Sequence, residues 1–146
     1  MTEDEKSQIA ALMAEEQVAV ISTAGDQWPT ATLEAFAETP EMDLIVIMGE
    51  KAERVANFAK RPHVTFLVAN RYGEVAKFQI KRLSGRGVAH EVASGSDEWN
   101  HLKKIFLAKN SFEEPFFGNP TLKMFRIKPK FMKYADGLQP PFTVEF

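Results

Sequence analysis

The sequence predicts a mainly β domain of six antiparallel strands with flanking helices, arranged as a small closed or partly open barrel. Short segments rich in β-branched and other apolar residues recur along the chain. Most of them are separated by short turns, which favour antiparallel pairing. The length of 146 residues is typical of one domain, so residues 1–146 are read as a single unit. Six strands connected in this way usually close into a barrel or a partly open one.

The elements are expected in the order helix, two strands in a hairpin, strand, short helix, strand, long strand, helix and final strand. The expected strands cover residues 17–23, 28–38, 44–48, 63–69, 75–92 and 122–134, the last in two pieces. The expected helices cover residues 2–16 and 50–60 and a segment that begins after Ser96.

Local signals support several of these boundaries. Thr2 followed by Glu5 matches a capping box at the start of the first helix. Pro62 disfavours helix at the residue before it and so ends the second helix. Gly85 and Gly87 inside the long strand predict a bulge or a sharp bend.

The net charge of −2 conceals an uneven distribution. Residues 1–50 carry a balance of −10, residues 51–90 a balance of +7, and the remainder +1. The basic segment indicates either a local anion site or a solvated basic face opposite an acidic one. A pI of about 5.9 argues against nucleic acid as a partner and favours a small phosphorylated ligand.

Composition excludes several other classes of function. The chain has no cysteine, which removes disulfides, thiolate metal sites and thiol nucleophiles. Its N-terminus is acidic, unlike a secretory signal, and no apolar run approaches the ~20 residues of a membrane span. We therefore expect a soluble cytoplasmic protein without membrane partners. His63, His90 and His101 lack metal-ligand spacing, so no metal site is expected, and no catalytic triad is legible.

Four stretches, taken in order, resemble the pyridoxamine 5'-phosphate oxidase-like, FMN-binding split-barrel family. They are residues 18–23 with the turn to 28–29, residues 44–64, residues 83–89 and residues 125–129, and together they span about residues 8–135. The resemblance implies a six-stranded antiparallel split β-barrel of Greek-key type. It also implies a homodimer that binds FMN at the subunit interface.

The resemblance further implies the residues that bind the cofactor. Arg54 occupies the family's basic phosphate-contacting position, and Thr32 stands where many members carry an arginine. Met48 and Ala52 stand where members often carry a threonine and a serine. The full implied set is Thr32, Met48, Gly49, Lys51, Arg54, Asn57 and Gln79.

Each of the residues discussed next could instead have an ordinary structural role. Arg54 and Lys51 either bind phosphate or form a solvated helix face. A guanidinium at a helix start can chelate phosphate with the help of free backbone N–H groups. Gln79 is either a hydrogen-bond donor to the flavin edge or an ordinary strand residue.

Aromatic residues admit similar alternatives. Trp28 and Trp99 are either stacking partners for a cofactor or part of core or interface packing. The loop with Phe112, Phe116 and Phe117 is read as a lid over the cofactor or as part of a dimer contact, against simple core. Twelve Phe, six Met and two Trp exceed what a small barrel interior holds, which favours a two-fold dimer.

The leading functional hypothesis is an FMN-dependent oxidoreductase acting on a small-molecule substrate. In such a protein the flavin carries the electrons, so no catalytic acid or base is needed from the chain. The alternative is a non-catalytic binding module that holds FMN, a deazaflavin or haem. Haem would need an axial ligand, for which His63, His90 and His101 are the candidates. Vitamin B6 oxidase activity is not expected, because its substrate-binding residues are not recognisable.

Overall fold

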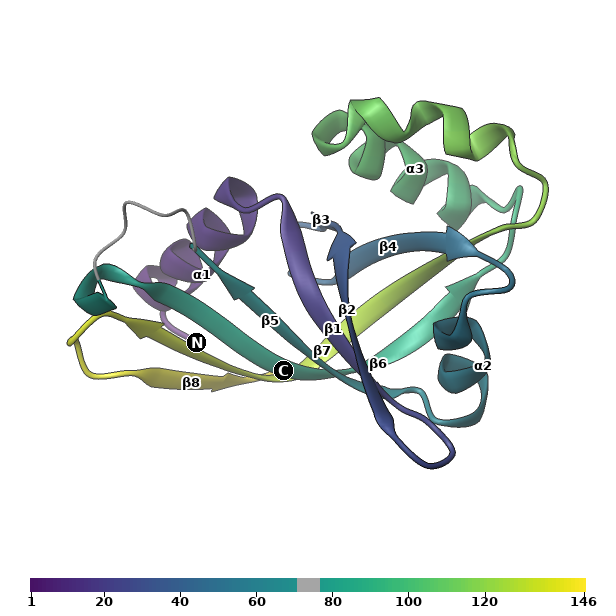
Figure 1. Cartoon of the computed structure of the whole chain (residues 1–146). Helices are drawn as coiled ribbons and strands as arrows, with labels where there is room; N and C mark the ends of the chain where they lie inside the picture. The colour runs from purple at the N-terminus through teal and green to yellow at the C-terminus, as the bar shows by residue number, and fades with distance from the viewer. Residues whose placement is uncertain (71–76) are drawn as a thin grey trace.

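A computed structural model describes residues 1–70 and 77–146 (Figure 1). The helices within these residues are α1 (Glu3–Glu15), α2 (Glu53–Lys60) and α3 (Asp97–Lys109), with 3-10 helices η1 (Lys77–Gln79) and η2 (Ser111–Gly118). The strands are β1 (Val18–Ala24), β2 (Pro29–Ala35), β3 (Ala37–Glu38), β4 (Leu44–Gly49), β5 (His63–Ala69), β6 (Lys81–Val92), β7 (Leu122–Asp136) and β8 (Phe142–Glu145).

The strands form one antiparallel, curled sheet in the order β2-β1-β5-β6-β7-β4-β3, and β8 pairs with residues 131–134 of β7. The end of the order curls back, so that β2 comes close to β4 without pairing with it. Figure 1 shows α1, α2 and α3 around this sheet. The predicted class, a mainly β antiparallel split barrel with flanking helices, is confirmed.

Strand number is where the structure differs from the prediction, with eight strands in the described part of the chain instead of six. The expected strand 28–38 breaks at the buried Phe36, after which β3 pairs with β4 at the far end of the order. The Pro-broken tail contributes β8. The expected strand 75–92 begins only at Lys81, and residues 71–76, which include most of the expected turn, lie outside the described residues.

Hydrogen bonds at the helix starts confirm the capping signals. The backbone N–H of Glu5 donates to Thr2 Oγ1 at 3.1 Å, and the N–H of Thr2 donates to Glu5 Oε2 at 2.8 Å. Ser96 Oγ accepts from the N–H of Trp99 at 3.1 Å, which caps α3. The predicted bulge also exists, because the β6–β7 register shifts between Arg86 and Gly87.

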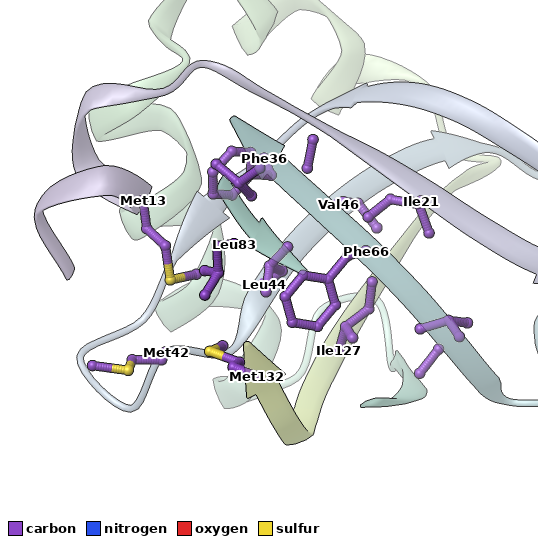
Figure 2. Packing of buried hydrophobic residues seen from close by; sticks show 14 of the residues in the cluster. Met13, Ile21, Phe36, Met42, Leu44, Val46, Phe66, Leu83, Ile127 and Met132 are labelled. Atoms are coloured by element: carbon purple, nitrogen blue, oxygen red, sulfur yellow. The ribbon is translucent and has the colours of Figure 1, made fainter. Parts of the chain in front are cut away.

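Two apolar clusters hold the elements together. The larger fills the curl of the sheet, where side chains of α1, β1, β4, β5, β6 and β7 converge (Figure 2). Phe66 lies near its centre, beside Leu44 and Ile127. The smaller cluster packs Trp99, Leu102 and other residues of α3 against β4 and β7.

None of the helices in the described residues is long and apolar enough to cross a bilayer.

The close packing of Phe66 against Gly85 gives a stability prediction. A Cβ at Gly85 would overlap the ring of Phe66, which is itself buried and cannot move aside. We expect Gly85→Ala to lower the free energy of unfolding by about 1–3 kcal/mol, the usual cost of overpacking. Gly118→Ala is the control, because a Cβ there meets nothing within 4 Å. Urea denaturation measures both, and equal stability of the two variants would contradict the assignment.

Candidate functional site

A polar cluster lies where α2 meets β2, the strand that forms one end of the sheet order. It consists of Thr32 and Glu34 from β2 and Arg54 from α2. Arg54 Nε lies 2.5 Å from Glu34 Oε1 as an ion pair. Thr32 Oγ1 donates to the same carboxylate oxygen at 3.0 Å. The side chains of Arg54 and Glu34 are 20% and 8% exposed, so the pair is largely removed from water. We call these three residues the edge cluster.

Strand alternation and the start of α2 build the edge cluster. Thr32 is paired with Ile21 and Glu34 with Ala19, and these β1 partners are buried, so both β2 side chains point to the inner face of the sheet. Arg54 is the second residue of α2 and reaches Glu34 from there.

A second set of contacts fixes α2 to the β1–β2 hairpin. Asn57 is buried, and its Nδ2 donates to Thr23 Oγ1 at 3.1 Å. Thr23 Oγ1 in turn shares a hydrogen bond of 2.6 Å with Thr30 Oγ1. Arg61 closes the other end, donating from Nε to the carbonyl of Ala24 at 2.9 Å. Asn57 therefore holds the helix that carries Arg54.

The electrostatics of the edge cluster are those of a buried carboxylate. Burial raises the pKa of Glu34, while the charge of Arg54 and the hydrogen bond from Thr32 oppose that rise. Burial also raises the pKa of Glu113 on η2, and the negative charge of Glu34 adds to the effect. The negative charges of these two carboxylates therefore oppose each other.

The guanidinium of Arg54 has N–H donors that form no hydrogen bond within the described residues. Its Nε is buried and faces Glu34, but the N–H is not aligned for a hydrogen bond. The two terminal nitrogens have no hydrogen-bond acceptor among the described residues. An arginine carries five N–H donors in a fork that matches phosphate. The donor set thus fits a phosphate group, and the carboxylate of Glu34 is the group in contact with Arg54 that opposes it.

The remaining implied residues are spread more widely. Gly49 ends β4 and Lys51 lies in the exposed turn that leads to α2, both close to Arg54 along the chain. The side chain of Met48 is buried in the larger core cluster. Gln79 belongs to η1, where its carbonyl accepts from Asn70 Nδ2 at 3.5 Å. Figure 1 places that segment at the opposite end of the sheet from α2, so Gln79 does not lie at the edge cluster.

The outer face of the sheet is hollowed over β1, β5, β6 and β7. Two adjoining cavities of about 460 and 450 Å³ share Ser22, Thr65 and Arg86. The guanidinium of Arg86 lies over the ring of Phe131, 4.5 Å from its centroid. His63 lines the first cavity. We call this region the outer hollow.

An apolar strip borders the outer hollow. Strand pairing places Val20 between Leu33 and Leu67, with all three side chains on the outer face. Leu33 is 60% exposed and Leu67 is 41% exposed. The alternation along residues 63–69 indicates one outward face, but neither this strip nor Ser22, Thr65 and Arg86 was predicted from the sequence. Glu34 was not predicted either, although an acid at an inward position of a strand was a readable signal.

The tryptophan and phenylalanine residues singled out from the sequence include both buried core residues and exposed ones. Trp99 is buried and packs edge-on against Phe117, with centroids 6.1 Å apart, so it belongs to the core. Trp28 is exposed beside the β1–β2 turn, and Phe112 and Phe116 are exposed on η2.

Within residues 1–70 and 77–146 no group of three or more His, Asp or Glu side chains could hold a metal ion.

Comparison with known proteins defines the fold but not the family. No protein-family model matches the chain, and no curated protein matches its sequence. A heme binding protein from Mycobacterium smegmatis superimposes with a TM-score of 0.87 at 13% identity, over 99% of this chain. This chain spans only 59% of that protein.

Two further solved structures match over nearly their whole lengths. A putative pyridoxamine 5'-phosphate oxidase from Listeria innocua has a TM-score of 0.72 and 16% identity, over 90% of this chain and 98% of its own. HutZ, a heme storage protein from Vibrio cholerae, has a TM-score of 0.67 and 20% identity, over 93% and 92%. At these identities the likeness establishes a shared fold alone.

Proposed function

We propose that the protein is an FMN-binding flavoprotein that transfers electrons to or from a small-molecule substrate, with the FMN phosphate bound at Arg54. The observation that carries the proposal is the meeting of Arg54 and Thr32 from separate elements, with the terminal guanidinium nitrogens left without acceptors. The shared fold with a putative pyridoxamine 5'-phosphate oxidase supports it.

The chain's own residues would position the cofactor and shield it. Arg54 would donate charge-assisted hydrogen bonds to the phosphate, and the exposed Lys51 on the preceding turn would add a second positive charge. Asn57 keeps α2 in place through Thr23. Bound FMN supplies the redox chemistry, so the protein needs no acid or base of its own. The exposed Phe112 and Phe116 of η2 would offer an apolar cover for the cofactor.

A homodimer with the cofactor at the subunit interface is part of the proposal. The exposed strip of Leu33, Val20 and Leu67 supports it, because monomeric proteins rarely leave large contiguous apolar patches in water. A two-fold pairing is the commonest way to cover such a surface. The outer hollow next to the strip would then lie between the two subunits.

Haem binding without turnover is the second candidate function, and the outer hollow favours it. His63 is exposed on the wall of the first cavity and could serve as an axial ligand. Arg86 and Lys130 line the same cavity and could pair with the carboxylates of a haem. Two of the solved structures with this fold are a heme binding protein and a heme storage protein.

Flavin titration tests the leading proposal. We expect Arg54→Ala to weaken FMN affinity at least about tenfold, because a charge-assisted hydrogen bond contributes roughly 1.5–3 kcal/mol. Lys60→Ala is the matched control, since Lys60 lies on the same helix but is exposed and pairs only with Asp26, at 3.6 Å, among described residues. Quenching of flavin fluorescence measures both affinities. Equal affinity of wild type and Arg54→Ala would place the phosphate elsewhere.

The visible absorption spectrum separates the two candidate functions. Flavin bands in the purified protein support the first, whereas a Soret band after addition of haem supports the second. In the haem case we expect His63→Ala to shift or abolish that band, because it removes the proposed axial ligand. His90→Ala is the control, since His90 is exposed on β6 but does not line either part of the outer hollow. An identical Soret band in both variants would exclude His63 as the ligand.

Light scattering tests the dimer. We expect wild type to show about twice the 16.5 kDa chain mass at micromolar concentration, and Leu33→Glu with Leu67→Glu to show the mass of one chain. Two buried negative charges per subunit would be too costly for the interface. Leu138→Glu is the control, because Leu138 is 87% exposed in the turn between β7 and β8. A monomeric wild type would overturn the dimer.

A further inference from the structure

We propose that Glu34 is a built-in competitor for the anion site at Arg54, so that the site binds a phosphate-bearing ligand more tightly when Glu34 carries no charge. Glu34 is a positioning residue in this scheme. It orients the guanidinium and sets the ligand affinity, but it does not react. The inference rests on the proposed function in placing the ligand phosphate at Arg54.

The geometry makes Glu34 a fixed internal anion. Its Oε1 lies 2.5 Å from Arg54 Nε and accepts a hydrogen bond from Thr32 Oγ1, so two partners on different elements hold it. Its side chain is only 8% exposed. A surface carboxylate could turn into water when a ligand arrives, whereas this one stays beside the guanidinium. A bound phosphate must therefore share Arg54 with Glu34.

The charges that face the site make this sharing unfavourable for an anion. Arg54 comes from α2 and Glu34 from β2, and the charge of Glu34 helps to raise the pKa of Glu113 on η2. Thr32 contributes a neutral hydroxyl. With both acids ionised, the largely buried guanidinium of Arg54 faces two negative charges before any ligand binds, and the second positive charge, on Lys51, lies in an exposed turn. Repulsion between like charges is strong where water is largely excluded.

Protonation of Glu34 would relieve the competition. Burial raises the pKa of Glu34, so its charge is lost at a higher pH than that of an exposed glutamate. As the pH falls through that pKa, the carboxylate becomes neutral and anion affinity rises. As the pH rises through it, the charge returns and affinity falls. Glu113, whose pKa is also raised, changes affinity in the same direction.

Sulfate binding to wild type and Glu34→Gln tests the competition directly. Sulfate keeps the same charge from about pH 5 to pH 8, whereas a phosphate monoester titrates near pH 6. Glutamine has the shape of glutamate and keeps an oxygen for Arg54 and Thr32. We expect Glu34→Gln to bind sulfate at least about fivefold more tightly than wild type at pH 8. We also expect the rise in wild-type affinity on acidification to be much smaller in Glu34→Gln.

FMN and riboflavin provide the second comparison, because riboflavin lacks the phosphate. We expect Glu34→Gln to tighten FMN binding and to leave riboflavin binding unchanged. Glu113→Gln is the graded control, with an effect of the same sign but smaller, because the ion pair of Arg54 is with Glu34 and not with Glu113. Isothermal titration calorimetry measures all of these affinities.

The outcomes separate this inference from the proposed function. If FMN binds wild type but Glu34→Gln binds FMN and sulfate no more tightly, the competition is wrong and the FMN proposal stands. If neither protein binds FMN but Glu34→Gln gains sulfate affinity, the competition stands and the FMN proposal fails. If Glu34→Gln does not fold, wild type and Arg54→Ala are compared from pH 8 to about pH 5.5. A pH-dependent sulfate affinity that Arg54→Ala abolishes supports the competition, and a flat wild-type profile overturns it.

Discussion

The pairing of β6 with β7 is the interaction on which the rest of the structure depends. It runs from Lys81 opposite Asp136 to Val92 opposite Met124 and is the longest ladder in the described residues. The strands β5, β1 and β2 extend from β6, whereas β4, β3 and β8 attach to β7. The register shift between Arg86 and Gly87, where β7 carries one extra residue, increases the local twist of the pair. The two halves of the sheet therefore curl toward each other, and the core fills the space between them.

The same curl leaves β2 with one unpaired edge, and the side chain of Arg54 lies against this strand. Within the described residues β2 pairs with β1 alone and only approaches β4, so one edge of β2 has no strand partner. α2, fixed to the hairpin by Asn57, brings Arg54 to Glu34 on this strand. A buried ion pair costs much of its Coulomb energy in desolvation, so it is weak evidence for a role in stability alone. Its position at a break in the barrel is the ground on which the ligand site at Arg54 is proposed.

Much of the fold was readable from the sequence, because strand composition, helix caps and the paired glycines are local signals. The meeting of Thr32 and Arg54 followed only from the family resemblance, since no local pattern tells which strand a helix will reach. Glu34 was missed for the same reason: its partner is twenty positions away. Gln79 was expected in a strand, but that strand begins two residues later and Gln79 lies in a 3-10 helix. The outer hollow depends on register across four strands, which the sequence does not specify.

The ring of Phe66 and the missing side chain of Gly85 act as one packing unit. The phenyl group occupies the volume that a side chain on β6 would otherwise need, and the two positions face each other across the β5–β6 ladder. Neither can be exchanged freely by itself, because a larger residue at 85 collides with the ring and a smaller one at 66 leaves a void. Substitutions at positions 66 and 85 are therefore expected to occur together in evolution. A larger side chain on one strand would be matched by a smaller one on the other.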